Sequence, residues 1–194
     1  MPLQRFLFAA LLLPVIACGD DPIAPRESIG VSGSITLQDG FEIPPGARVV
    51  VGWFKGDDQP ELFEIYGEAS LPQTSTTFSL TLASPPPASA MLGGLLGIGF
   101  ILVTADAELG DGDFLEAADF DALAGAGGQF AVIWTDGDPR IAQEIDWAAD
   151  FAPGYSVGRG VPRQDDFDAF EPAPDGAVIL EIGDIDAIEF VDFT

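Results

Sequence analysis

The sequence predicts a mainly β protein: a single β-sandwich of about seven to nine strands with one or two short helices, after an N-terminal apolar segment and a short linker. Several short segments alternate apolar and polar residues, which is the period of a strand with one buried face. Glycine (23) and proline (16) are frequent among the 194 residues, which favours many turns over long helices. The apolar fraction of 47% excludes a disordered chain.

The first alternating segment begins at Ile29, where Ile29, Val31, Ile35 and Leu37 are separated by small polar residues and glycines. Asp39-Gly40 predicts a turn after it, because this pair tolerates positive φ. Further strands are predicted at residues 47–55, 62–69, 78–82, 97–104, 129–135, 155–161, 177–182 and 185–193. Short helices are predicted near residues 115–123 and 141–149.

Residues 91–105 form the most apolar stretch of the body of the chain. A transmembrane helix is one interpretation, but the run is shorter than the roughly 20 residues that such a helix needs, and it contains glycines. A central strand buried on both faces, preceded by a bend at Gly93-Gly94, fits the length and composition better.

The charge balance limits the partners. Seven lysine and arginine residues stand against 32 aspartates and glutamates, a formal net charge of −25. Such a surface repels nucleic acid phosphates and anionic lipid headgroups, so nucleic acid is not an expected partner. The excess of acid is interpreted either as a solubility or salt adaptation or as a means of attracting cations or basic partners.

The chain contains no histidine and one cysteine, Cys18. Catalysis by Ser-His-Asp or Cys-His groups, zinc sites with histidine ligands and intramolecular disulfides are therefore excluded. We predict that the chain is not an enzyme. A carboxylate-based, metal-dependent hydrolase stays as an alternative, since only carboxylates or Lys55 could activate a serine or threonine.

The N-terminus has the parts of an export signal: Arg5, an apolar run from Phe6 to Ile16, and the small residue Ala17 before Cys18. Residues 15–18 (VIAC) resemble the lipobox of bacterial lipoproteins, in which Leu, a small residue and Gly or Ala precede Cys. Ala17 and Cys18 match this pattern, whereas Val15 and Ile16 depart from it. The resemblance implies cleavage before Cys18 and a diacylglycerol on its sulfur. The alternative is an ordinary secretory signal with an unrelated cysteine.

This organisation predicts a lipoprotein signal peptide at residues 1–17, a tether at residues 18–28 and a β-sandwich domain at residues 29–194. The tether is polar, proline-containing and without hydrophobic period. The expected localisation is the cell envelope, with the membrane as a partner through the lipid on Cys18. Gly19 follows the cysteine where enterobacterial inner-membrane retention uses Asp, so this resemblance favours the outer membrane.

Residues 31–36 (VSGSIT) and 45–51 (PGARVVV) resemble the opening of transthyretin-like and carboxypeptidase-regulatory-like domains, and immunoglobulin-like sandwiches begin in a similar way. The resemblance covers a small part of the chain and implies a β-sandwich alone. The chain as a whole is similar to small, acidic lipoproteins of unknown function, a likeness that implies no activity.

The best candidate for a metal site is the acidic segment that contains Asp106, Glu108, Asp111, Asp113 and Glu116. Calcium takes six to eight oxygen ligands, and glycines between carboxylates supply turns. The spacing departs from the EF-hand pattern, so the alternative is a solvated acidic loop. No other cofactor is predicted.

Three further groups are candidates for binding. Residues 136–139 (DGDP) are expected to form a turn, and residues 165–168 (DDFD) a solvated loop. Trp53, Trp134 and Trp147 could stack on a sugar, but Trp53 and Trp134 lie in strongly apolar segments and are expected in the core. Trp147 is the tryptophan expected to be exposed.

Together these observations predict a lipid-anchored cell-envelope protein with a non-catalytic binding or structural role. A calcium-binding envelope or adhesion module is the first alternative.

Overall fold

The computed structural model describes residues 28–55, 62–83, 85–106, 108–162 and 169–190. The predicted signal peptide, almost all of the tether and the 165–168 cluster lie outside the described residues. The strands are β1 (Ile29–Leu37), β2 (Arg48–Phe54), β3 (Leu62–Ser70), β4 (Thr77–Leu82), β5 (Leu96–Thr104), β6 (Phe114–Glu116), β7 (Gly125–Thr135), β8 (Gly154–Val161), β9 (Ala169–Pro172) and β10 (Val178–Ile182). The helical turns are α1 (Ile141–Glu144) and the 3-10 segments η1 (Ala88–Ala90), η2 (Ala117–Ala122), η3 (Asp146–Asp150) and η4 (Ile185–Ala187).

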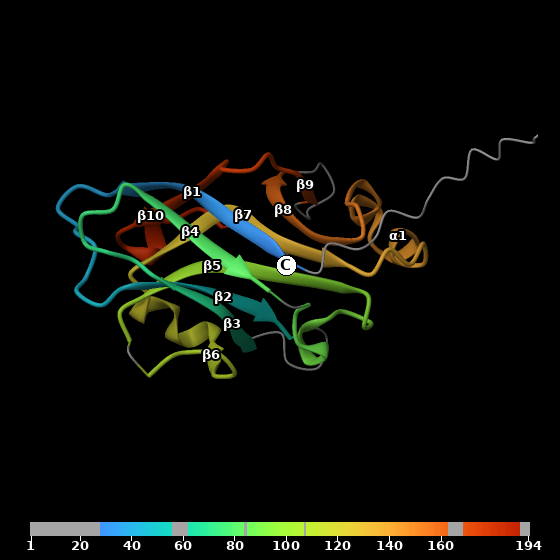
Figure 1. The fold of residues 1–194 in the computed structure, drawn as a ribbon, viewed down its shortest axis with the longest axis horizontal. Coiled ribbons are helices and arrows are strands. Elements are labelled where there is room, and N and C mark those ends of the chain that lie inside the picture. The colour runs from blue at the N-terminus through green and yellow to red at the C-terminus, as the bar shows by residue number, and fades with distance from the viewer. Residues whose placement is uncertain (1–27, 56–61, 84, 107, 163–168, 191–194) are drawn as a thin grey trace, which may run out of the picture.

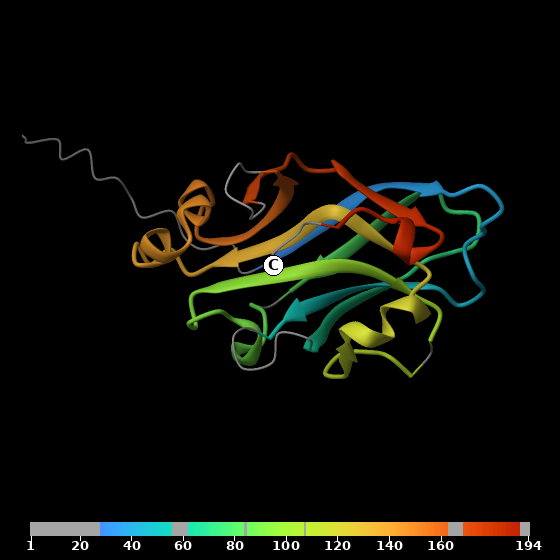
Figure 2. The same cartoon turned by 180° about the vertical axis from the view of Figure 1, so that it is seen from behind.

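The prediction of a mainly β fold with short helices is confirmed, with ten strands in one continuous sheet. The strand order is β4-β1-β10-β7-β5-β2-β3-β6, and β8 joins β7 to β9. Neighbouring strands are antiparallel except for β1 and β10. The sheet curls strongly (Figures 1 and 2), so that Leu82 of β4 lies against Gly67 of β3. The two layers of the sandwich are therefore halves of one curled sheet.

Each face of the curled sheet carries its own hydrophobic core. The inner core collects the inward residues of β1, β2, β4, β5, β8 and β10, among them Val31, Val49, Trp53, Leu80, Ile101 and Leu180. The outer core lies under η2, η3, η4 and α1, and it includes Ile65, Leu102, Ile133, Trp147, Phe170 and Ile188. The short helical turns thus cover the outer face of the sheet, where open strands would leave apolar side chains in water.

Strand β5 explains the most apolar stretch of the sequence. It pairs with β2 on one side and β7 on the other, and all nine of its residues are buried. The predicted bend before it is present, since Gly93 and Gly94 have φ of 55° and 74°. The prediction of a central strand is confirmed. Within the described ranges we find no helix with the length and apolar character needed to cross a bilayer.

The glycines of β5 make room for Trp53, which is completely buried in β2. A Cβ at Gly97 or Gly99 would lie 3.1 or 3.0 Å from the Trp53 ring, tighter than nearly all real contacts. The indole Nε1–H donates to the carbonyl of Tyr66 at 3.2 Å, so the one polar atom of the ring is satisfied. Glycines of β5 opposite the large Trp53 ring therefore allow the interior to reach the close packing that is usual in proteins.

Tyr155, 1% exposed and 6.0 Å from the Trp53 ring, gives the inner core a pH dependence. Burial, with a smaller contribution from Tyr66, raises the pKa of Tyr155 well above the ordinary value of 10. The unfolded chain ionises this phenol above about pH 10, and the folded chain does not. The contribution of the un-ionised Tyr155 to the free energy of unfolding is thus fully present below that pH and is lost as pH rises above it.

We expect urea unfolding at pH 9 and pH 11 to show this loss, at about 1.4 kcal/mol per pH unit for one tyrosine. A Tyr155→Phe variant should lose stability less steeply over the same interval. Equal slopes in the two proteins would show that Tyr155 does not carry the effect.

One predicted strand is wrong, and two short strands were not predicted. The strand predicted at residues 185–193 is absent over residues 185–190, where the chain forms η4 (Ile185–Ala187) followed by an irregular segment. The Asp184 carboxylate accepts a hydrogen bond from the amide of Asp186 at 3.2 Å, and Ile185 and Ile188 are both buried at the three-residue spacing of a 3-10 turn. Strands β6 and β9 were not predicted, because three and four residues are too few to establish a period.

Candidate functional site

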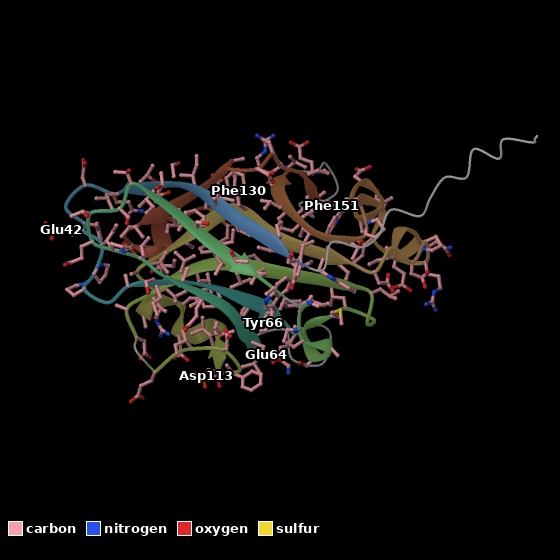
Figure 3. The ribbon with its side chains drawn as sticks, viewed as in Figure 1. Glu42, Glu64, Tyr66, Asp113, Phe130 and Phe151 are labelled. Atoms are coloured by element: carbon pink, nitrogen blue, oxygen red, sulfur yellow. The ribbon has the colours of Figure 1, made fainter. Side chains whose placement is uncertain are left out.

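The predicted metal-binding segment is the connection between β5 and β6, which folds against β3. The amide of Gly112 donates to the carbonyl of Ile65 at 2.8 Å, and the amide of Ile65 donates to the carbonyl of Asp113 at 2.9 Å. Strand β6 then continues this pairing with β3, from Phe114 to Glu116. The segment is thus an extension of the sheet edge. Glu64, Tyr66 and Asp113 lie together on this side of the molecule (Figure 3).

Three of the five predicted ligands hold backbone amides instead. Asp111 Oδ1 accepts from the amide of Gly67 at 2.7 Å, which fastens the loop to β3. Asp113 Oδ2 accepts from the amide of Gly110 at 2.8 Å, and Asp106 Oδ1 accepts from the amide of Glu108 at 2.8 Å. Aspartate side chains commonly stabilise turns in this way.

The guanidinium of Arg48 lies against this loop. Arg48 of β2 donates to the carboxylate of Glu68 at 2.6 Å, to the carbonyl of Asp106 at 2.6 Å and to the carbonyl of Leu109. Its side chain is 19% exposed. Because Arg48 precedes the loop by more than fifty positions, the sequence offered no signal of this contact.

The five predicted ligands do not converge. Within the described part of the chain, no three acidic side chains lie close enough together to hold a metal ion. Glu108 and Glu116 are exposed, the latter in β6. The geometry supports the alternative of an acidic loop, and calcium binding at Asp106, Glu108, Asp111, Asp113 and Glu116 stays a prediction.

A calcium titration followed by thermal melting tests that prediction. We expect Asp111→Asn to lower the melting temperature without calcium, because the weaker amide oxygen replaces a charged acceptor for Gly67, a loss of about 1 kcal/mol. Asp119→Asn is the matched control, since Asp119 is an exposed acid of η2 outside the predicted ligand set. A calcium-dependent rise in melting temperature that Asp111→Asn abolishes and Asp119→Asn preserves would establish a site.

The segment 136–139 forms the turn that was predicted, with Gly137 at a φ of 83°. Both nitrogens of the Arg140 guanidinium that face Asp138 donate to Oδ2 of this residue, at 2.8 and 2.5 Å. The hydrogen bonds from the Arg140 side chain and backbone lower the pKa of Asp138. The carboxylate therefore has a cationic partner two residues away, in an exposed ion pair.

The tryptophans do not form a sugar-binding face. Trp53 is fully buried, as predicted, and Trp134 is partly buried. The prediction that Trp147 is exposed is wrong: it is 8% exposed in the outer core. Phe151 and Phe170 meet its ring edge to face at centroid distances of 5.8 and 5.3 Å. Asp146, the acidic neighbour of Trp147, is exposed, whereas Trp147 and Ala148 of the same 3-10 turn are buried.

One cluster was missed in the sequence because its members come from three separate elements. The Ser89 hydroxyl in η1 donates to Glu64 Oε2 of β3 at 2.5 Å, and the Lys55 ammonium lies 3.6 Å from the same oxygen. Lys55 also lies 4.8 Å from the centre of the Phe114 ring. The Ser89 hydroxyl and the Lys55 ammonium both approach the same oxygen of Glu64, so the arrangement is an ion pair with an added hydrogen bond.

No protein-family model, curated protein or solved structure matches this chain.

Proposed function

We propose that this protein is an exported lipoprotein, anchored in the cell envelope by lipid on Cys18, whose β domain has a non-catalytic binding or structural role. The outer membrane is the favoured location. Residues 1–17 are the cleaved signal peptide, and residues 18–28 tether the domain to the membrane.

The observation that carries the proposal is the position of the only cysteine. Cys18 directly follows the apolar run and the small residue Ala17, and it directly precedes a polar segment. Two or three acyl chains on one residue anchor a protein stably, where a single chain binds only marginally.

The domain and its tether fit this arrangement physically. Strand β1 begins at Ile29, so residues 18–28 are the connection between the anchor and the folded body. Extended, such a segment reaches about 35–40 Å. A body with a formal net charge of −24 (5 Lys+Arg against 29 Asp+Glu in residues 29–194) is repelled by anionic headgroups, and a tether of this length lets it stand beyond the electrostatic screening distance of about 8 Å.

Intact-mass analysis of the full chain expressed in a Gram-negative host tests the anchor. We expect a mature protein that begins at Cys18, carries two or three acyl chains and sediments with membranes. Cys18→Ser should abolish the acyl mass and release the protein from the membrane fraction. Ser28→Ala, at the other end of the tether, is the matched control and should leave both unchanged. An unmodified thiol at Cys18 on a mature, membrane-free protein would contradict the proposal.

A non-catalytic role is supported by the residue types and by the use of the carboxylates. Histidine is absent, and Asp106, Asp111 and Asp113 of the acidic loop accept hydrogen bonds from backbone amides. Turnover in a hydrolase screen that requires added metal, and that Asp111→Asn or Asp113→Asn removes, would favour the metal-dependent hydrolase instead.

A further inference from the structure

We infer that strand β4 is a self-association edge, at which the β4 strands of two copies of this chain pair antiparallel and join their sheets. The inference concerns a second copy of the chain and does not depend on lipidation of Cys18.

The position of β4 in the sheet is the first argument. Among the described strands, β4, β6 and β9 lie at the edges of the sheet and each has a paired neighbour on one side only. The neighbour of β4 is β1. The amide of Ile35 donates to the carbonyl of Thr76, at the start of this ladder. In an antiparallel strand, the backbone N–H and C=O groups of successive residues point to opposite sides. The backbone groups of Phe78, Leu80 and Leu82 therefore bond to β1. The backbone groups of Thr77, Ser79 and Thr81 then point to the free edge.

The three ends differ in how they are protected. Natural edge strands avoid pairing by being very short or by carrying charges or proline. Strand β6 has three residues, ends at Glu116 and adjoins Asp113. Strand β9 has Glu171, paired with Arg159, and ends at Pro172. Strand β4 has six residues, TFSLTL, without a charge or a proline.

The lack of charge around β4 is unusual in this chain. No charged residue occurs between Glu68 and Asp106, and none occurs in β1. The outer side chains of β4 and β1 are hydroxyls: Thr77, Ser79 and Thr81 on β4 and Ser32, Ser34 and Thr36 on β1. In Figure 1, β4 and β1 lie side by side across the front of the molecule.

This charge distribution favours a second copy as the occupant. Two folded bodies repel one another wherever acidic surfaces meet, because residues 29–194 carry a formal net charge of −24 (5 Lys+Arg against 29 Asp+Glu), but an uncharged edge allows them to approach. A two-fold axis through Ser79 would place Ser79 opposite its equivalent, and Thr77 opposite Thr81 of the other copy. Opposed Thr and Ser pairs stabilise antiparallel strands. The inward residues Phe78, Leu80 and Leu82 stay in their own core.

Disulfide trapping tests the pairing in cells that express the full chain. With Ser79→Cys, the two sulfurs would face each other across a hydrogen-bonded pair with a Cα separation of about 5.5 Å, within disulfide range. We expect a mild oxidant to produce a covalent dimer on a non-reducing gel. Ser34→Cys is the matched control, because Ser34 is an exposed serine of the same face one strand farther from the edge. The unaltered chain controls for links through Cys18.

Two further measurements separate self-pairing from other partners. Ser79→Lys should raise the dissociation constant of the dimer by about tenfold or more in sedimentation of the detergent-solubilised full chain, since like charges would then be directly opposed. Association of the unaltered chain should strengthen with added salt, which screens the repulsion of the two acidic bodies. Equal trapping of Ser79→Cys and Ser34→Cys, or linkage of Ser79→Cys to a different protein alone, would overturn the inference.

Discussion

Replacing Gly33 by alanine is expected to lower the free energy of unfolding by about 3 kcal/mol or more, at the upper end of the usual cost of overpacking. Gly33 lies at the centre of β1, in register with Val178 of the parallel neighbour β10. A Cβ at this position would lie 1.9 Å from the carbonyl oxygen of Val178 and 2.7 Å from its carbonyl carbon. These are backbone atoms, so no change of rotamer can relieve the overlap. The two strands would have to separate.

Gly30 provides the matched control, because it lies in the same strand and a Cβ there meets nothing within 4 Å. Gly30→Ala is expected to leave stability unchanged or to raise it by up to about 0.5–1 kcal/mol, since alanine loses less backbone entropy on folding. Urea unfolding of the two variants measures the difference. If they were equally stable, the close approach of β1 and β10 would be disproved.

Replacing Arg48 by methionine is expected to lower the free energy of unfolding by about 2–3 kcal/mol, because hydrogen bonds to charged groups contribute about 1.5–3 kcal/mol and a half-buried guanidinium leaves its acceptors unsatisfied. Arg48 joins β2 to Glu68 of β3 and to the carbonyls of Asp106 and Leu109. Without it, Glu68 would lose its cationic partner, and the loop carbonyls of Asp106 and Leu109 would lose their donor. We expect faster amide hydrogen exchange across residues 108–113.

Arg159→Met is the control for Arg48, since the ion pair that Arg159 forms within the described residues is with Glu171, and its side chain is 53% exposed. An exposed pair of this kind contributes about 0–1 kcal/mol. Arg48→Lys should recover part of the stability, because an ammonium keeps the charge but cannot reach three acceptors in the guanidinium geometry. Equal losses in Arg48→Met and Arg159→Met would show that the loop does not depend on Arg48.

Local patterns predicted most of the strands because the period of two is a property of the strand itself. Strand β4 has outward and inward residues in strict alternation, and its sequence TFSLTL shows this directly. Strand β5 has no alternation because it is buried on both faces, and its length and glycines separated it from a membrane helix. The turn at Asp39-Gly40 was predicted because Gly40 needs a positive φ, which is 89° in the structure.

The candidate site could not be predicted from these patterns. The acidic segment was identified, but Asp111 binds the amide of Gly67 and the loop carbonyls bind Arg48, and these two residues come from other strands. Trp147 illustrates the same limit: it directly follows Asp146, which suggested exposure, and it is buried by Phe151 and Phe170. The Ser89–Glu64–Lys55 cluster has no sequence pattern, because η1, β3 and the end of β2 meet only in the folded chain.

The sequence by itself determined the mainly β class, the positions of the long strands and the acidic, uncharged and apolar stretches from which each surface is built. The tertiary structure alone decided that β1 pairs with β10 in parallel, that the sheet curls until β4 approaches β3, and that Arg48 holds the acidic loop. The reason is physical. The alternation of side chains between the two faces of a strand follows from the backbone geometry of that strand. The residues that each side chain contacts are decided by packing between segments that are far apart in the chain.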